Sequence, residues 1–334
     1  MSVTIKDIAR LSGVSYSTVS KALNDSPLVK DDTKRKILNL AQKLGYQPNI
    51  AAQSLVSKKS RTIGLLWPTV ERAALSSLAT KINEELEKNS YSMILSINSV
   101  ESAINLFNRF QVDGILVFDE SVSSHHHIGS ITSLAPVLCF GESGSRNIPS
   151  LDVNRQEAIR DAVHYLGRLG HKRISYIGDL TDRIIQQKKY LGFTKGICEL
   201  GLHVHPDMAI NSYGLSWEDG YNAAKRLIES SYSPTAIVSG SYDLTVGIIR
   251  ALNEYRLQIP GDLSLISYDN IPQFASFDVP ITAIGAPVEN IAKGIVEALL
   301  KLINQDESKE PLHDDFPSLQ SELKERESCS KPSA

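Results

Sequence analysis

Residues 4 to 24 read Thr-Ile-Lys-Asp-Ile-Ala-Arg-Leu-Ser-Gly-Val-Ser-Tyr-Ser-Thr-Val-Ser-Lys-Ala-Leu-Asn. This stretch predicts two short helices joined by a tight turn. Thr4 and Asp7 have the spacing of a capping box at the start of the first helix. Gly13 stands where that helix has to end in a left-handed conformation, and Ser15 can cap the second helix.

The second helix of this stretch has two chemically different faces. Val19, Ala22 and Leu23 form the apolar face that we expect to point inward. The opposite face carries short polar side chains and one lysine: Tyr16, Ser17, Thr18, Ser20 and Lys21. Short side chains let a helix approach base edges, and a lysine reaches a phosphate or a guanine. The pattern favours a helix-turn-helix that enters a DNA major groove; the alternative is a surface helical hairpin with no partner.

The charge is distributed unevenly along the chain. The whole sequence has a formal net charge of −3, but residues 1–62 carry 11 Lys and Arg against 4 Asp and Glu. The remaining residues carry 24 basic and 34 acidic side chains. A basic head on an acidic body is typical of a nucleic-acid-binding module attached to another domain.

A third helix and a linker complete this head. The third helix has an apolar stripe at helical spacing, made of Ile37, Leu38, Leu40, Ala41 and Leu44. We therefore assign residues 1–47 to the helical head and 48–60 to a linker. Residues 50–57 can form two helical turns, which are marginal alone in water. Leu55 could then act as an apolar wedge in a minor groove; an ordinary flexible linker is the alternative.

Residues 61–334 predict an α/β core, in which short apolar runs alternate with helical stretches. The expected strands are 62–67, 92–97, 114–118, 136–140, 173–177, 236–239 and 263–267. The expected helices are 75–88, 100–110, 154–169, 184–201, 216–230, 243–256 and 288–303. This alternation indicates parallel sheets covered by helices, with ligands bound at the carboxyl ends of the strands. No apolar run approaches membrane-spanning length and no signal peptide is recognisable, so we expect a cytoplasmic protein.

Catalytic, metal and cofactor sites find no support in the sequence. Cys139, Cys198 and Cys329 are isolated, so they suggest neither a disulfide framework nor a zinc site. The run His125-His126-His127 is better explained as a solvated loop, because consecutive positions do not converge on one ion. We find no phosphate-binding loop and no nucleophile elbow. We therefore expect a protein that is not an enzyme and has no cofactor.

The chain resembles the lactose/galactose repressor (LacI/GalR) family of bacterial transcription regulators. The matching segments are 3–9, 13–20, 44–49 and 52–55 in the head, and 63–64, 112–114, 170–174, 259–262, 268–270 and 326–328 in the core. This resemblance implies a small all-α headpiece and a core of two Rossmann-like subdomains, as in periplasmic sugar-binding proteins. It also implies a homodimer that binds a pseudo-palindromic DNA operator.

The same resemblance assigns the DNA-contacting residues. Tyr16, Ser17 and Lys21 would be the main base readers, and Ala52 and Leu55 would enter the minor groove. The remaining implied phosphate or base contacts are Thr4, Ser15, Thr18, Ser20, Asn24, Thr33, Tyr46 and Asn49. Lys30 departs from the family, which often has a capping Ser there. Lys21 replaces a common Arg, which is a better bidentate guanine reader.

The expected effector site also departs from the family pattern. Lys189 stands where an Arg usually holds a sugar, and Ser241-Tyr242 replaces a usual Asn-Asp pair, whereas Asp269 matches. A lysine supplies one movable charge rather than a bidentate fork. Three interpretations are open: the pocket binds an anionic sugar such as a sugar acid, it binds a neutral sugar through other side chains, or it has lost its effector.

We therefore expect a repressor of a carbohydrate-utilisation operon, controlled by a small sugar or sugar acid. In this hypothesis the linker helices order on DNA, and effector binding changes their spacing. The tail lacks leucine heptads, so a dimer is expected rather than a tetramer. The competing interpretations are a cytoplasmic sugar-binding protein without DNA activity and an intracellular α/β enzyme.

Overall fold

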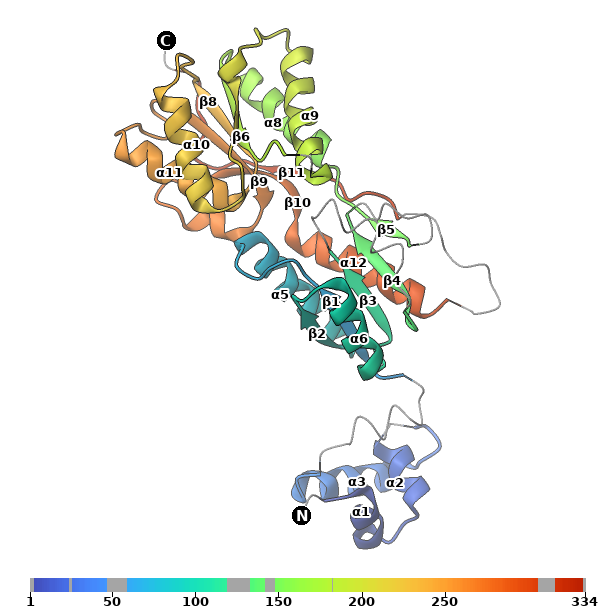
Figure 1. The fold of residues 1–334 in the computed structure, drawn as a ribbon. Coiled ribbons are helices and arrows are strands. Elements are labelled where there is room, and N and C mark those ends of the chain that lie inside the picture. Colours follow the sequence, from blue (N-terminus) through green and yellow to red (C-terminus); the bar gives the residue numbers. More distant parts are fainter. Residues whose placement is uncertain are drawn as a thin grey trace. The chain divides into compact units, whose positions relative to one another are not determined.

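The computed structural model describes residues 3–23, 26–46, 59–118, 133–141, 148–181, 183–305 and 316–332. The chain divides into two compact units, Met1–Ser60 and Arg61–Ala334. We call the first unit the headpiece and the second the core (Figure 1).

In the residues that the structure describes, the headpiece packs three helices around a small apolar centre. Its helices are α1 (Ile5–Ser12), α2 (Tyr16–Leu23) and α3 (Asp31–Lys43). The buried centre consists of Ile8, Val19, Ala22, Val29, Ile37 and Ala41. Leu38, which we predicted on the apolar stripe of the third helix, is instead 43 % exposed, and Leu11 of α1 is 57 % exposed. Both side chains lie outside the buried centre, because three short helices are too small to cover the full width of each other's apolar face.

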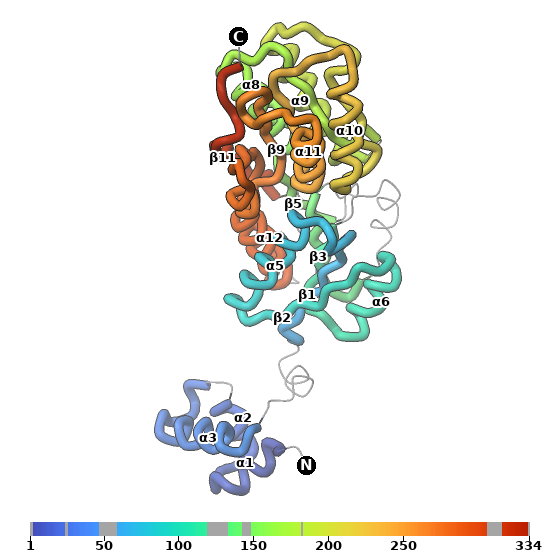
Figure 2. Tube along the Cα trace, turned by 90° about the vertical axis from the view of Figure 1, so that its left-hand side faces the viewer, coloured from blue at the N-terminus to red at the C-terminus, as the bar shows by residue number. Residues whose placement is uncertain are grey.

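The first lobe of the core is built on a five-stranded parallel sheet with the order β2-β1-β3-β4-β5. Its strands are β1 (Thr62–Leu66), β2 (Ser92–Ser96), β3 (Gly114–Val117), β4 (Val137–Phe140) and β5 (Ser150–Leu151). Its helices are α5 (Ala73–Lys88), α6 (Val100–Phe110) and α12 (Val288–Ile303). Alternate residues of β1 face the two sides: Ile63 and Leu65 pack in the main core, while Leu66 packs with Phe107 of α6. Helix α5 packs against α12 on the face opposite α6 (Figure 2).

The second lobe has a six-stranded sheet with the order β11-β10-β9-β8-β6-β7. Its strands are β6 (Ile174–Gly178), β7 (Ala209–Asn211), β8 (Ala236–Ser239), β9 (Ser264–Asn270), β10 (Thr282–Pro287) and the antiparallel β11 (Glu322–Lys324). Its α-helices are α8 (Arg155–Leu169), α9 (Ile184–Glu199), α10 (Trp217–Glu229) and α11 (Tyr242–Glu254), and its 3-10 turns are η1 (Pro206–Met208) and η2 (Pro272–Ser276). The pairs α8–α9 and α10–α11 cover opposite faces of the sheet (Figure 1).

The chain crosses between the lobes three times. The crossings follow β5, join β10 to α12, and lead from α12 to β11. The first and third crossings pair with each other, because Val153 forms a parallel bridge with Leu319 and the Leu319 N–H donates to the Asp152 carbonyl at 2.9 Å. Neither lobe is therefore a continuous segment of sequence.

The predicted fold class is confirmed, and so are the seven predicted strands and the seven predicted core helices, with ends that differ by at most three residues. Four strands were missed: β5, β7, β10 and β11. Three of them are only two or three residues long. Strand β10 contains two Ala, one Gly and a terminal Pro, and such residues are poor strand formers that pair here because the neighbouring strands enclose them.

Candidate DNA interface and effector cleft

The turn between α1 and α2 has the geometry that the sequence predicted. The Thr4 N–H donates to the Asp7 carboxylate at 3.0 Å and the Thr4 hydroxyl donates to it at 2.7 Å. These two bonds, aided by Arg10, lower the pKa of Asp7. Gly13 has φ 72° and ends α1, and the Ser15 hydroxyl accepts from the Thr18 N–H at 3.1 Å.

The predicted base-reading face of α2 lies on the surface. Tyr16, Ser17 and Lys21 are exposed, and Tyr16 keeps 53 % of its area accessible. On the same helix, Val19 and Ala22 are buried in the headpiece centre. The buried face fixes the helix to α1 and α3, so the polar face is presented on a rigid support.

The other predicted DNA contacts are placed as follows. Ser15 and Thr4 are exposed, while Thr18, Ser20, Thr33 and Tyr46 are half-buried. Burial raises the pKa of Tyr46, and the charge of Tyr16 raises it further. Helix α3 begins at Asp31 without a side-chain cap from Lys30. Asn24, Asn49, Ala52, Leu55 and most of the proposed 48–60 linker lie outside the described residues.

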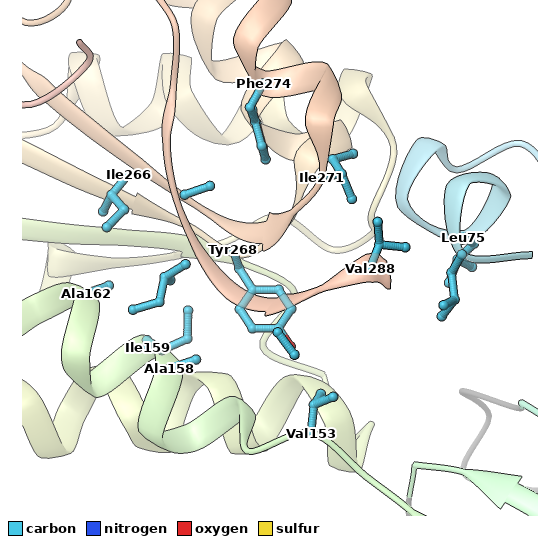
Figure 3. Close-up of a cluster of buried hydrophobic side chains, with 14 of the residues drawn as sticks. Leu75, Val153, Ala158, Ile159, Ala162, Ile266, Tyr268, Ile271, Phe274 and Val288 are labelled. Carbon is cyan, nitrogen blue, oxygen red and sulfur yellow. The ribbon is translucent and has the colours of Figure 1, made fainter. Parts of the chain in front are cut away.

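A cavity lies between the two lobes of the core. It contains about 610 Å³ of space not filled by atoms, part of it open to solvent. Its apolar wall includes Leu75 of α5, Phe140 of β4 and Val288 of α12, and Tyr268 of β9 faces them from the second lobe. Figure 3 shows Tyr268 of the second lobe beside Val153 and Val288, with Leu75 of the first lobe nearby. The space lies at the carboxyl ends of β3, β4 and β9, where open α/β sheets bind ligands.

Two of the four predicted effector residues line this cavity, Lys189 and Asp269. Lys189 is 3 % exposed, and its ammonium donates to the Gly240 carbonyl at 2.7 Å and lies 4.0 Å from the centre of the Tyr268 ring. Asp269 has the left-handed φ of 82°, which is strained for a residue other than glycine. Its carboxylate accepts from the Tyr242 N–H at 2.9 Å.

The other two predicted effector residues are not among those that line the cavity. Ser241 is fully buried, and its hydroxyl caps α11 by accepting from the Leu244 N–H at 3.4 Å. Tyr242 packs its ring on Phe274 and Phe277, with centroids 5.0 and 5.8 Å away. Tyr242 acts on the cleft through its backbone, which holds Asp269 in place.

A charged cluster that the sequence analysis did not select contributes Arg155 to the lining of the cavity. Arg155 is 5 % exposed, lines the cavity and forms an ion pair with Asp152. The Lys188 ammonium lies 3.1 Å from the same Asp152 carboxylate. Burial alone would raise the pKa of Asp152, but Arg155 and Lys188 outweigh it and hold this pKa below its usual value.

A second ion pair connects the two lobes. Arg72 precedes α5 in the first lobe, and its Nε lies 3.9 Å from Oδ2 of Asp243 in α11 of the second lobe. The side chains are 17 % and 18 % exposed. The Asp243 carboxylate also accepts a hydrogen bond from the Ala73 N–H, at the start of α5. Burial raises the pKa of Asp243, and the Asp269 charge adds to this effect against the opposing influence of Arg72.

One signal in the sequence could have identified these residues. Arg72 follows β1, and Arg155 follows β5, both at the carboxyl ends of parallel strands. That position is where ligand-binding residues of α/β sheets occur. The sequence next to Arg72 and Arg155 contains no motif. Only their position after strands of the parallel sheet identifies them as candidate ligand-binding residues.

Two further sequence observations concern membranes and metals. Of the helices that the structure describes, none has the length and apolar content required to cross a membrane. The run His125-His126-His127 lies outside the described residues.

Comparisons with known proteins agree on one family. The description "Bacterial regulatory proteins, lacI family" matches residues 4–49, and "Periplasmic binding protein-like domain" matches residues 163–329. Catabolite control protein A of Priestia megaterium is 32 % identical over 313 residues, which cover 92 % of this chain and 94 % of that protein. The probable HTH-type transcriptional repressor ExuR of Bacillus subtilis (strain 168) is 29 % identical over 314 residues. These residues cover 92 % of this chain and 93 % of that protein.

The solved structures show the same fold. The Lac repressor dimer bound to operator and the anti-inducer ONPF has a TM-score of 0.81 at 22 % identity, and the match covers 99 % of this chain and 100 % of that chain. A helix-turn-helix headpiece, a two-lobed core with a cleft, and a relative above 30 % identity over nearly the whole length lead to one conclusion. The chain belongs to the LacI family of bacterial regulatory proteins.

Proposed function

We propose that this protein is a dimeric repressor of a carbohydrate-utilisation operon, which binds a pseudo-palindromic DNA operator under the control of a small sugar or sugar acid. The observation that carries this proposal is the exposed polar face of α2 on a buried helix-turn-helix core. The chain is a DNA-binding transcription regulator and not an enzyme, as the names of its relatives as regulators and repressors support. A cytoplasmic location follows from the need to reach DNA.

The proposed DNA contacts divide into three groups. Tyr16, Ser17 and Lys21 read base edges, and Ala52 and Leu55 enter the minor groove. The phosphate or additional base contacts are Thr4, Ser15, Thr18, Ser20, Asn24, Thr33, Tyr46 and Asn49. Phosphate contacts set the position of α2 on DNA, whereas base contacts set the sequence preference.

In this mechanism, two headpieces bind two half-sites related by the two-fold axis of the dimer. The effector binds in the cleft, where Lys189 and Asp269 are the proposed ligands that line the cavity. Ser241 and Tyr242 are the other two proposed effector residues, and the Tyr242 N–H also holds the Asp269 carboxylate in place. Because the cleft involves both lobes, a ligand there can favour one lobe arrangement over another, and only such differential binding changes DNA affinity.

The proposal is tested by selecting operators from a random DNA pool with the full-length protein. A gel shift with the selected and a scrambled duplex, at two salt concentrations, then measures specificity. We expect Lys21→Ala to weaken specific binding by about 1–3 kcal/mol if it reads a guanine. If Lys21 contacts phosphate instead, binding should weaken about equally on every sequence and the salt slope should fall by about 1.

Lys88→Ala is the matched control, because Lys88 is a core lysine whose ammonium pairs with Glu85. It should leave DNA binding unchanged. The repressor proposal fails if the wild-type protein selects no sequence from the pool, or if the protein binds DNA but Tyr16→Ala and Lys21→Ala leave both affinity and sequence preference unchanged.

A further inference from the structure

The turn that joins β8 to α11 is bonded to the effector cleft at two points. This turn comprises residues 240–243, and we call it the β8–α11 turn. The Lys189 ammonium donates to the Gly240 carbonyl at 2.7 Å, and the Asp269 carboxylate accepts from the Tyr242 N–H at 2.9 Å. Lys189 and Asp269 both line the cavity. A ligand that contacts either of them therefore acts on groups that hold this turn.

Asp243, the last residue of the β8–α11 turn, caps a helix of the other lobe. Its carboxylate accepts a hydrogen bond from the Ala73 N–H, which is the first N–H of α5. Such an N–H has no acceptor within its own helix, and the N-terminus of a helix attracts negative charge. Arg72 stands at the N-cap position of α5, and its Nε lies 3.9 Å from Oδ2 of Asp243. The second lobe thus supplies the side chain that caps a helix in the first lobe.

The carboxylates of Asp243 and Asp269 oppose each other electrostatically. Burial raises the pKa of Asp243 most, and the Asp269 charge raises it further against the influence of Arg72. A neighbouring negative charge disfavours the ionised form of a carboxyl group. The ionised form is the one that caps α5 and attracts Arg72 most strongly. The charge on Asp269 therefore weakens the contact that Asp243 makes with the first lobe.

A ligand in the cleft can reduce this opposition. Asp269 is among the described residues that line the cavity, and Asp243 is not. A hydroxyl group that donates to Asp269 draws part of its charge onto the ligand, so the repulsion of Asp243 decreases. The bond from the Tyr242 N–H holds the Asp269 carboxylate in position while its charge changes in this way.

We propose that Asp243 is a positioning residue that transmits effector binding from the cleft to the first lobe. An effector whose hydroxyl groups donate to Asp269 strengthens the contact of Asp243 with Ala73 and Arg72. The arrangement of the lobes in which this contact is formed then becomes more populated, because the ligand binds that arrangement better. This inference rests on the proposed function, in which the cleft is the effector site.

The test replaces the ligand by a substitution at Asp269, so it needs no identified effector. Asp269→Asn removes the charge and keeps an oxygen that can accept from the Tyr242 N–H. Asn also tolerates the left-handed φ of 82° at this position. Amide hydrogen exchange at Ala73, followed by NMR on the full-length protein with isotope-labelled alanine, measures how often the contact with Asp243 opens. We expect Asp269→Asn to slow this exchange by about fivefold or more, as for coupled sites in general.

A second background shows whether the effect passes through the charge of Asp243. In Asp243→Asn, the carboxamide oxygen can still accept from the Ala73 N–H but carries no full charge. Adding Asp269→Asn to this variant should therefore leave the exchange at Ala73 unchanged. Asp278→Asn alters an exposed carboxylate of the same lobe and is the matched control, which should exchange as the wild type does. The Ala103 amide, bonded at the start of α6, is the reference that should not respond in any variant.

Three results would overturn the inference. They are an unchanged exchange at Ala73 in folded Asp269→Asn, an equal slowing when Asp269→Asn is added to Asp243→Asn, and an equal slowing in Asp278→Asn. A gel shift with the selected operator separates these results from a failure of the proposed function. If the protein selects an operator and Ala73 does not respond, this inference fails and the repressor proposal stands. If Ala73 responds and no operator is selected, the repressor proposal fails and the coupling of the cleft to the first lobe stands.

Discussion

The contact of Asp243 with the start of α5 should control how firmly the two lobes hold together. In Asp243→Ala, the second lobe loses its ion pair with Arg72 and its hydrogen bond from the Ala73 N–H. Both bonds connect the lobes, and both partners remain in the first lobe. We therefore expect the variant to populate open arrangements of the core that the wild-type protein rarely visits.

The magnitude follows from the two lost contacts. Unit charges about 4 Å apart attract by about 4 kcal/mol at an effective dielectric constant of 20. The raised pKa of Asp243 shows, however, that burial destabilises the ionised carboxylate more than the charge of Arg72 stabilises it. Burial therefore offsets the attraction of Arg72, and we count only the hydrogen bond from Ala73, at about 2 kcal/mol for a charged acceptor. A loss of about 2 kcal/mol changes the closed-to-open ratio by about 30-fold.

Asp243→Asn separates the two contributions. The carboxamide oxygen can still accept from Ala73, but without a full charge, so about 1 kcal/mol should be lost. Asp278→Ala removes an exposed carboxylate elsewhere in the same lobe and serves as the control. The expected order of opening is Asp243→Ala, then Asp243→Asn, with Asp278→Ala equal to wild type.

Pulsed electron resonance between spin labels measures this opening. Cys198 is exposed on α9 of the second lobe, and Lys88→Cys adds a site on α5 of the first lobe. Cys329→Ser removes the half-buried thiol, and Cys139 is buried. Asp243→Ala should broaden the distance distribution or shift it to longer values. An unchanged distribution in Asp243→Ala would falsify the view that this contact holds the lobes together.

Three other substitutions test separate parts of the structure. His171→Ala removes a buried imidazole bonded to two hydroxyls and a carbonyl at 2.8–3.1 Å, and should cost about 3 kcal/mol in chemical denaturation at pH 8. Burial lowers the pKa of His171, so the unfolded chain binds its proton more readily. Wild-type stability should therefore fall as the pH drops below 6.5, and the cost of His171→Ala should shrink at pH 5; an equal cost at both pH values contradicts this. Gly247→Ala places a methyl group 1.9 Å from the Trp217 carbonyl and should destabilise the core by about 3 kcal/mol, whereas a melting temperature like that of wild type would mean that α10 and α11 separate easily. Ser15→Ala should cost the headpiece about 1 kcal/mol and speed amide exchange at Thr18, and unchanged exchange would show that the cap is dispensable.

The local features of the headpiece could be predicted because they depend on neighbouring residues. The capping interactions of Thr4 and Ser15 and the left-handed Gly13 involve partners three or four positions away. The exposure of Leu11 could not be predicted in the same way. It depends on how much of α1 the other two helices cover, which is a tertiary property.

The cleft was only half predictable for the same reason. Lys189 and Asp269 follow from the resemblance to the family, and both line the cavity. Arg155 and Arg72 come from segments 83 residues apart that meet only when the lobes assemble. Ser241 is not among the residues that line the cavity, and its hydroxyl caps α11, an interaction that the sequence analysis did not predict.

The threefold passage of the chain between the lobes restricts how such regulators can be recombined. A graft of one lobe from another protein would need a cut at each of the three crossings, and two of these seams would fall in the paired segments around Val153 and Leu319. The headpiece, by contrast, is joined to the core by a single covalent connection. Exchanging whole cores beneath a fixed headpiece is therefore the feasible route to sensors with new inputs, and ligand specificity within one core has to evolve by point substitution.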